Sequence, residues 1–479
     1  MLGGQGRDRP LAPPRVTPAR QSGLRLSWPS RSWEPGEALG CPSHRAITTE
    51  TFADAAGSAE NVRVIHGDAL QVAGALVSEG MAGKVDLVYV DPPFASQTAY
   101  TYEARLDGPA DGRVLRARAY DDRWDGDGVA RYLDMLAPRL DALTQLLAPG
   151  GTIWVHVDYR ASYLVRLVLD EALGRRAFLN EIVWRRAPNL GRQAASDQFG
   201  RTLDTLVVYG GKDATLVPPT RLEPIAPAAV RWDEQGRPFT AAPRGDYTDE
   251  SIERLAREGR VHRTASGKVY VKYFLVQDGD GAWCRARRVD ALWTDVPPLR
   301  HARTGERTGF PTQKPRALLD RIVACASPPG GLVVDLFAGS GTTGESAHAL
   351  GRRCFLGDSS PLAVAMTRAR LLRAGARLVV QRCGAAAPPQ AALPVVSIER
   401  RGKKVRVELL APTEPLAWAI HVPSDVAAPT RTVWHSERAP GARTRAALRE
   451  ASLEDVPERL GVTVWHDDGS TGTSVLEAP

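Results

Sequence analysis

The stretch VDLVYVDPPF, residues 85–94, decides the fold, because an apolar run ends there in an acidic residue and two prolines. Residues 85–90 have the pattern of a buried strand, and open α/β sheets bind ligands at the carboxyl ends of such strands. Two prolines with fixed φ angles hold the Asp91 carboxylate and the neighbouring carbonyl oxygens in one geometry. Phe94 adds a face on which a flat substrate can stack. Acceptors beside a stacking face suit an exocyclic amino group of a nucleobase.

A second apolar strand runs into a glycine turn in LVVDLFAGSGTT, residues 332–343. Glycines at such a turn let the backbone approach a ligand closely. Gly339 and Gly344 have the spacing of a phosphate-binding loop, but Glu345 stands where that loop carries lysine and would repel phosphates. The turn therefore favours a cofactor with positive charge and no phosphate, and S-adenosylmethionine is such a cofactor.

Four segments in order, VIHGDAL at 64–70, DPPF at 91–94, TQKP at 312–315 and DLFAGSGTT at 335–343, carry a family resemblance. They resemble the β class of amino-methylating DNA methyltransferases, which are mostly adenine-N6 enzymes with some cytosine-N4 members. The resemblance covers roughly residues 60–375. It implies the α/β, circularly permuted Rossmann-like fold of an S-adenosylmethionine-dependent methyltransferase. An inserted target-recognition region and a small C-terminal β-rich module are expected in addition.

The resemblance also implies roles for the tetrapeptide Asp91, Pro92, Pro93 and Phe94. The Asp91 carboxylate and the Pro92 carbonyl oxygen would accept hydrogen bonds from the target amine, and Phe94 would stack on the base. The base would be flipped out of the duplex, as methyltransferases require. No covalent nucleophile is needed, and no cysteine lies near the tetrapeptide, unlike the cytosine-C5 enzymes.

The cofactor-binding residues implied by the resemblance are Asp335, Phe337, Ala338, Gly339, Ser340, Gly341, Thr342, Asp358, Lys314 and Asp68. Asp358 would accept from the ribose hydroxyls, although Gly357–Pro361 is one residue shorter than the usual Gly-x-acid-x-Ser-Pro. Lys314 would meet the cofactor carboxylate, and its alternative role is that of a surface lysine before a helix. Asp68 would line the adenine pocket, and its alternative role is a helix N-cap.

The pattern of the chain predicts five parts. Residues 1–50 lack periodicity and predict a disordered extension. Residues 51–184 form a catalytic half, with an apolar helix face at residues 132–147 that ends before Gly150. Residues 185–310 form a target-recognition region, 311–380 a cofactor-binding half, and 395–479 a β-rich module whose role the sequence does not indicate.

The region 185–310 breaks the strand–helix alternation and holds 21 Lys and Arg against 16 Asp and Glu, a net +5 of the chain's +7. Arginines contact phosphates and read guanine edges, so the candidate DNA-binding residues are Arg185, Arg192, Arg285 and Arg288. The alternative is a solvated surface insertion, and the residues alone do not separate the two. The resemblance favours recognition, because β-class enzymes place their target-recognition region between the two halves.

Composition bounds the remaining possibilities. At 43% hydrophobic and 24% charged residues, with no apolar run of membrane-spanning length, the chain is expected to be globular and cytoplasmic, without a membrane anchor. Five scattered cysteines without a C-x-x-C pair argue against a zinc site or a disulfide framework, and no metal is expected. A pI near 9.2 is compatible with a polyanionic partner.

The sequence thus predicts sequence-specific methylation of adenine N6 in double-stranded DNA. Asp in the first tetrapeptide position is typical of adenine enzymes in the family, whereas Ser is commoner in cytosine-N4 enzymes. Cytosine N4 is the first alternative. The second is a DNA-binding or defence-complex subunit without turnover, although such a subunit needs neither Asp91 nor the glycine loop. A cognate restriction or defence subunit is a candidate partner, and the oligomeric state is left open.

Overall fold

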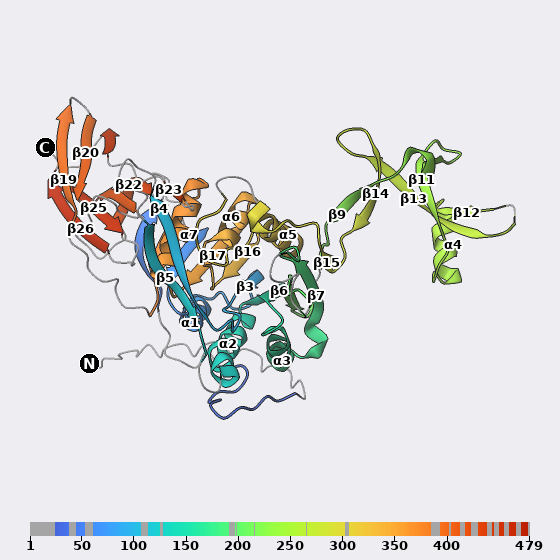
Figure 1. The fold of residues 1–479 in the computed structure, drawn as a ribbon, viewed down its shortest axis with the longest axis horizontal. Helices are drawn as coiled ribbons and strands as arrows, with labels where there is room; N and C mark the ends of the chain where they lie inside the picture. The colour runs from blue at the N-terminus through green and yellow to red at the C-terminus, as the bar shows by residue number, and fades with distance from the viewer. Residues whose placement is uncertain are drawn as a thin grey trace, which may run out of the picture. The chain divides into compact units, whose positions relative to one another are not determined.

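A computed structural model gives the fold (Figure 1). The residues it describes are 24–37, 45–52, 61–106, 114–124, 128–190, 197, 199–214, 216–264, 266–301, 306–384, 393–401, 404–411, 417–422, 430–437, 443–444, 450–454, 459–465 and 471–477. They divide into two compact units, one made of Met1–Leu216 with Ala291–Pro479 and the other of Val217–Asp290.

A largely parallel sheet forms the centre of the first unit, with the strand order β15-β7-β8-β6-β3-β16-β17-β2-β18-β1. Strands β6, β3, β16, β17, β2 and β18 are parallel, whereas β8 runs antiparallel to β6 and β7, and β1 runs antiparallel to β18. Their bounds are β1 Ile47–Phe52, β2 Val62–His66, β3 Val85–Val90, β6 Leu147–Val157, β7 Phe178–Arg185, β8 Leu203–Gly210, β15 Leu292–Trp293, β16 Leu332–Asp335, β17 Arg353–Asp358 and β18 Leu378–Arg382.

The two halves of the sequence interleave in this sheet. Strand β3 pairs with β16, and β17 pairs with β2, so the strands that carry the two loops lie side by side although more than 200 residues separate them. This arrangement confirms the predicted circularly permuted Rossmann-like fold. Because parallel strands end at the same edge, residues 91–94 and 336–343 meet there.

Helices cover the sheet in two groups, α1 with α2 and α3, and α5 with α6 and α7 (Figure 1). The bounds are α1 Ala69–Ser78, α2 Gly128–Thr144, α3 Ser162–Leu173, α5 Arg316–Ala326, α6 Thr342–Ala349 and α7 Pro361–Arg373. The apolar face predicted at 132–147 is that of α2, with Leu136, Leu140 and Leu143 fully buried. The helix ends earlier than predicted, at Thr144, because Leu147 already pairs with Val85 as the first residue of β6.

The expectation of a disordered extension over residues 1–50 is wrong for residues 24–37 and 45–50. Residues 24–37 pack on α2 and α3, where the Trp28 indole N–H donates to Asp134 at 2.7 Å. The Arg31 guanidinium pairs with Glu171 at 2.9 Å, with both side chains under 10% exposed. The sequence does not reveal this segment, because the contacts that anchor it lie more than 100 positions away along the chain. The rest of the predicted extension lies outside the described residues.

The second unit, Val217–Asp290, is smaller than the predicted region 185–310. Its elements are β9 Thr220–Pro224, β10 Arg231–Trp232, β11 Pro238–Pro243, α4 Asp249–Arg257, β12 Val261–Arg263, β13 Val269–Gln277 and β14 Trp283–Arg288. Ile252, Leu255 and Val271 form its own small core. The boundary differs because β7 and β8 complete the main sheet, with β8 antiparallel to β6, so residues 185–210 belong to the first unit.

Two hairpin strands and the C-terminal strands complete the first unit. Strands β4 Thr98–Leu106 and β5 Val114–Asp122 form a hairpin directly after the tetrapeptide. The C-terminal strands are β19 Val395–Arg401, β20 Lys404–Ala411, β21 Ala417–Val422, β22 Thr430–Glu437, β23 Arg443–Thr444, β24 Glu450–Glu454, β25 Arg459–Trp465 and β26 Thr471–Glu477. The predicted β-rich character is confirmed, but β22 pairs with β1, so four of these strands continue the main sheet. Among the described helices, none has the length and apolar character needed to cross a membrane.

Candidate active site

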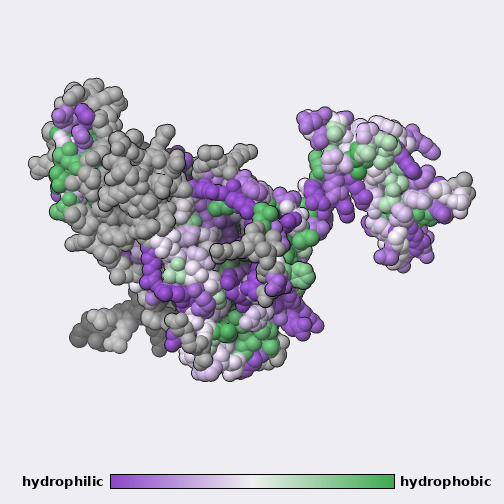
Figure 2. Space-filling model, in the orientation of Figure 1, coloured by the Kyte–Doolittle hydropathy of each residue, from purple (hydrophilic) through white to green (hydrophobic). Residues whose placement is uncertain are grey.

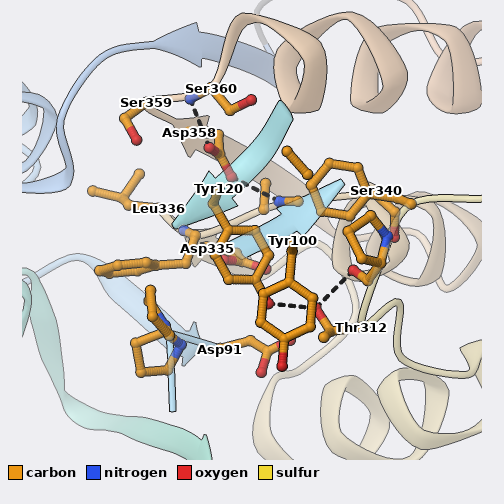
Figure 3. A pocket seen from close by; sticks show the side chains of 18 of the residues that line it. Asp91, Tyr100, Tyr120, Thr312, Asp335, Leu336, Ser340, Asp358, Ser359 and Ser360 are labelled. Atoms are coloured by element: carbon orange, nitrogen blue, oxygen red, sulfur yellow. Dashed lines mark hydrogen bonds between the residues drawn. The ribbon is translucent and has the colours of Figure 1, made fainter. Parts of the chain in front are cut away.

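One cavity of about 490 Å³ lies at the carboxyl edge of β3 and β16. It brings together the whole tetrapeptide with the residues expected to bind a cofactor (Figure 3). The predicted cofactor residues that line it are Asp68, Lys314, Asp335, Phe337, Ala338, Gly339, Ser340, Thr342 and Asp358. Both sets of residues thus face one space.

Asp91 forms an ion pair with Lys314. The Lys314 ammonium donates to both carboxylate oxygens, at 2.7 Å to Oδ1 and 2.6 Å to Oδ2, and the two side chains are 9% and 19% exposed. The same ammonium lies 4.9 Å from the centre of the Phe94 ring. Lys314 was expected at the cofactor carboxylate or at the surface. The surface position is wrong, because Lys314 lies nearly buried against Asp91, at the end of a pairing that spans 223 positions, and it lines the cavity.

Asp335 supports the glycine loop from below. Its side chain is 1% exposed and accepts hydrogen bonds from the Phe337 N–H at 2.9 Å and from the Thr343 hydroxyl at 2.6 Å. Burial raises the pKa of Asp335 to about 7, although these hydrogen bonds act in the opposite direction. Figure 3 shows Asp335 behind Tyr100 and Tyr120, between Asp91 and Asp358.

Two glycines of the loop have positive φ angles but different surroundings. Gly339, at φ +50°, lines the cavity, and its N–H donates to Asp358 at 2.9 Å. Gly341, at φ +76°, is the N-cap of α6, and a Cβ there would lie 2.9 Å from the backbone of Thr367 on α7. Gly341 was expected to make room for the cofactor. In the structure it makes room for α7.

Asp358 lies at the end of β17, with its carboxylate over the glycine loop. Besides the Gly339 N–H it accepts from the Ser360 N–H at 2.8 Å (Figure 3). Burial raises the pKa of Asp358 to about 6. Asp68 takes the alternative role of N-cap of α1, accepting from the Leu70 N–H at 2.9 Å, and it also pairs with Arg139 while it lines the cavity.

Glu345 stands where a phosphate-binding loop carries lysine, and two arginines compensate its negative charge. Its carboxylate pairs with Arg316 on α5 at 3.4 Å and with Arg370 on α7. It therefore joins three helices behind the loop, and Arg370 also reaches the Thr342 hydroxyl at 2.9 Å.

A buried polar chain under Phe94 was not foreseen. The Tyr89 hydroxyl lies 2.9 Å from His156 Nδ1, and His156 Nε2 lies 3.2 Å from Asp204. Because a carboxylate only accepts, Nε2 carries a hydrogen, and in the neutral ring Nδ1 then accepts from Tyr89. The His156 ring stacks on Phe94 at 5.9 Å, and Arg186 closes the chain at 2.7 Å from Asp204. The sequence does not reveal this chain of hydrogen bonds, because its members are single residues on three separate strands and no regular spacing links them.

Asp122 was also missed. Its buried carboxylate accepts N–H groups from the loop that follows the tetrapeptide. In addition, Tyr100 and Tyr120 of the β4–β5 hairpin stack at 4.8 Å, and the Tyr120 hydroxyl lies 3.0 Å from that of Thr312 (Figure 3). The hairpin thereby forms a wall of the cavity and touches both halves of the sequence.

The described candidate DNA-binding arginines belong to two different units. Arg185 is exposed at the end of β7 in the first unit, whereas Arg285 and Arg288 lie on β14 of the second unit. The Arg285 guanidinium lies 3.5 Å from the centre of the Tyr273 ring. Arg192 lies outside the described residues.

Similar proteins were found among curated sequences and solved structures. The chain is 27% identical over 319 residues to the Type II methyltransferase M.EcaI of Enterobacter cloacae, covering 61% of this chain and 65% of that one. It is 24% identical over 328 residues to the StyLTI Mod subunit, part of a Type III restriction-modification enzyme of Salmonella typhimurium, covering 57% and 49%. The chain thus spans between half and two thirds of the length of these relatives.

Among solved structures, the M1.HpyAVI–SAM complex matches with a TM-score of 0.36 and 17% identity over 65% of this chain and 99% of that one. The cytosine-N4-specific PvuII DNA methyltransferase matches with a TM-score of 0.37 and 14% identity over 66% and 89%.

A family model described as DNA methylase matches residues 85–368, more than half of the 479 residues. The matched range includes the tetrapeptide, the glycine loop and the strands that bring them together. This chain belongs to the N6/N4 DNA methylase family.

Proposed function

We propose that this protein transfers a methyl group from S-adenosylmethionine to the N6 amino group of adenine in a specific DNA sequence. S-adenosylmethionine is the methyl donor that the family uses. The observation that carries the proposal is the single cavity shared by Asp91 and the glycine loop, because methyl transfer needs donor and acceptor in contact.

The cavity suits the proposed cofactor. Gly339 exposes backbone to it, and the carboxylates of Asp335 and Asp358, which line the cavity without an arginine or lysine partner among the described ion pairs, favour a ligand with positive charge. Asp358 would hold the ribose, and Phe337 with the glycine loop would hold the methionine part. When bound, the cofactor supplies an electrophilic methyl group.

The tetrapeptide would prepare the target amine. The lone pair of such an amine is delocalised into the ring, and acceptors for its hydrogens return the lone pair to nitrogen. The Asp91 carboxylate and the Pro92 carbonyl oxygen are these acceptors, and Phe94 supplies the face for the flipped base. Because Lys314 bonds to both oxygens of Asp91, an incoming amine must share that carboxylate with it. Asp91 also stabilises the positive charge that develops on nitrogen.

Adenine is proposed over cytosine because the first tetrapeptide residue is Asp, as in most adenine-N6 members of the class. Cytosine N4 is the second candidate, since both bases present an exocyclic amine and the family includes both activities. A subunit without turnover is disfavoured by the intact Asp91 and glycine loop. The similarity to a Type III Mod subunit supports a restriction subunit as partner.

We also propose that Val217–Asp290, together with the rest of the predicted region 185–310, recognises double-stranded DNA. Figure 2 shows hydrophilic side chains over much of the visible face of this unit. Basic residues on such a surface contact phosphates.

The test is single-molecule sequencing of DNA from cells that express the protein, which reports both the modified base and its sequence context. Asp91→Ala should lower the methylation rate by ~10²-fold or more, because one preorganised electrostatic group is removed. Titration should show that S-adenosylmethionine still binds to this variant. Substantial methylation by Asp91→Ala would contradict the role assigned to Asp91. Detection of N4-methylcytosine in place of N6-methyladenine would show that the target base is cytosine.

A further inference from the structure

The loop that follows the tetrapeptide has an unfavourable backbone conformation. Ala95 has φ +57° and Gln97 has φ +58°, and both carry a Cβ. Side-chain-bearing residues seldom adopt this left-handed region, and they keep it only where surrounding contacts impose it. The contacts that impose it here are therefore of interest, because the loop begins at Phe94.

The Asp122 carboxylate collects four N–H donors from this loop and its neighbour. Oδ2 accepts from Phe94 N at 3.1 Å and from Ser96 N at 2.7 Å. Oδ1 accepts from Ala95 N at 2.9 Å and from the Trp124 indole at 2.8 Å. The Asp122 side chain is 1% exposed, so these bonds face little competition from water. Three consecutive backbone N–H groups around one anion form a nest, which matches the left-handed residue within it.

The backbone on either side reinforces the same arrangement. Gln97 N donates to the Asp122 carbonyl oxygen at 2.9 Å, and the Gln97 side chain accepts from Trp124 N at 3.0 Å. The Tyr132 hydroxyl on α2 donates to the Pro93 carbonyl oxygen at 2.9 Å. The tetrapeptide is thus held by α2 on one side and by the base of the β4–β5 hairpin on the other.

We propose that Asp122 is the positioning residue of the catalytic loop, setting the place of Phe94 and, through it, the base-binding end of the tetrapeptide. The inference rests on the proposed function. Asp122 acts by accepting hydrogen bonds from the backbone, and it need not touch substrate. A hydrogen bond to Phe94 N fixes the peptide that follows Pro93, so loss of the carboxylate frees the residue on which the base stacks. Small displacements of such groups slow a reaction far more than they weaken cofactor binding.

The test compares Asp122→Asn with wild type. The amide keeps one acceptor oxygen but replaces the other with a donor, which opposes the N–H groups already pointing at it. Hydrogen–deuterium exchange should show lost protection at residues 94–96. The rate of methyl transfer should fall roughly 10²-fold, while the affinity for S-adenosylmethionine stays within about 2-fold. A 2-aminopurine probe at the target position should report altered stacking of the flipped base.

Asp121→Asn is the matched control for the exchange experiment. Asp121 is the neighbouring residue, but its carboxylate bonds to Arg118 and Arg123 on the exposed side of the hairpin. Protection of residues 94–96 should survive this change.

Ala95→Gly in the Asp122→Asn background provides a rescue. Glycine adopts a positive φ without penalty, so the loop should regain part of its geometry and of its methylation rate. If Asp122→Asn does not fold, Trp124→Phe removes one of the four donors and should produce a smaller loss of the same kind.

Two outcomes would overturn the inference. One is an Asp122→Asn variant that methylates at the wild-type rate with residues 94–96 still protected. The other is a loss of methylation accompanied by an equal loss of cofactor affinity, which indicates a general structural role. Failure of the proposed function is separate, because wild-type protein would then methylate no DNA while the exchange result at residues 94–96 could still hold.

Discussion

Asp335 is the residue whose ionisation is most tied to the proposed cofactor. Its carboxyl lies beneath the glycine loop, and burial raises its pKa to about 7 from an ordinary value of 3.8. The folded protein therefore binds a proton here more tightly than the unfolded chain does. The stabilising contribution is fully present below about pH 4 and is lost as the pH rises through about 7.

This raised pKa predicts proton release on cofactor binding. A sulfonium in the cavity favours the charged carboxylate and should lower the pKa of Asp335, so binding near pH 7 should release a fraction of a proton. Calorimetry in buffers of different ionisation enthalpy measures that fraction. S-adenosylhomocysteine, which lacks the sulfonium charge, should release less, and Asp335→Asn should remove the difference. Equal proton release for the two ligands with wild-type protein would show that Asp335 does not respond to the charge.

Asp91 and Lys314 depend on each other as an ion pair. Each side chain is nearly buried, and each gives the other a partner that the sequence alone does not reveal. A buried charge without its partner is costly, so removing either side chain would leave the other charge unpaired.

At the level of elements, the glycine loop joins β16 to α6 and contains two glycines with separate tasks. Gly339 faces the cavity, and an added Cβ would lie 3.3 Å from a side-chain atom, on the Phe310 ring. Gly341 faces the backbone of α7, and the hydrogen bonds within that helix keep this backbone in place.

Substitutions should separate these tasks. Gly339→Ala is expected to cost about 1–2 kcal/mol of stability from its positive φ and to lower the affinity for S-adenosylmethionine. Gly341→Ala should cost more stability, because the same strain is joined by a contact at 2.9 Å with Thr367. Thermal unfolding and ligand titration on the two variants test this. A Gly341→Ala protein more stable than Gly339→Ala, or a Gly339→Ala protein with unchanged affinity, would contradict the assignment.

On the scale of the whole molecule, the proposal that the second unit recognises DNA depends on where its arginines lie. In β14, Arg285 pairs with Leu275 of β13 and with Glu223 of β9, whereas Arg288 pairs with Thr220. Because side chains alternate along a strand, Arg285 and Arg288 point to opposite faces of this small sheet. One flat face of the sheet cannot present both to the same stretch of DNA.

Alanine substitutions at Arg285 and Arg288 should therefore differ in effect. An arginine that contacts a phosphate should weaken binding to all duplexes and flatten the salt dependence by ~0.9 log unit. An arginine that reads a base should instead relax specificity at one position, at a cost of roughly 1–3 kcal/mol. Binding across salt concentrations and methylation of cognate and mismatched sites distinguish the two.

Arg287→Ala is the matched control, because Arg287 shares the face of Arg285 but is already paired with Glu223 at 3.4 Å. If neither Arg285→Ala nor Arg288→Ala changes binding or specificity, recognition lies outside β14.

The sequence by itself determined the central sheet and the two loops at its edge. Apolar runs of strand length, each ending in a polar or glycine turn, are local signals, and they placed β3 and β16 with their loops correctly. The order of the tetrapeptide and the glycine loop carried the resemblance to the β class of DNA methyltransferases, and that resemblance implied the permuted fold.

Tertiary structure alone decided which side chains satisfy one another. Lys314 meets Asp91 across 223 positions, Asp122 reaches back 26 to 28 positions to the loop at 94–96, and residues 24–37 dock on α2 and α3. These contacts depend on how separate elements pack, and the sequence around a polar residue does not identify its distant partner. Gly341 shows the same limit, because its positive φ suited the predicted turn while the neighbour that requires glycine belongs to another helix.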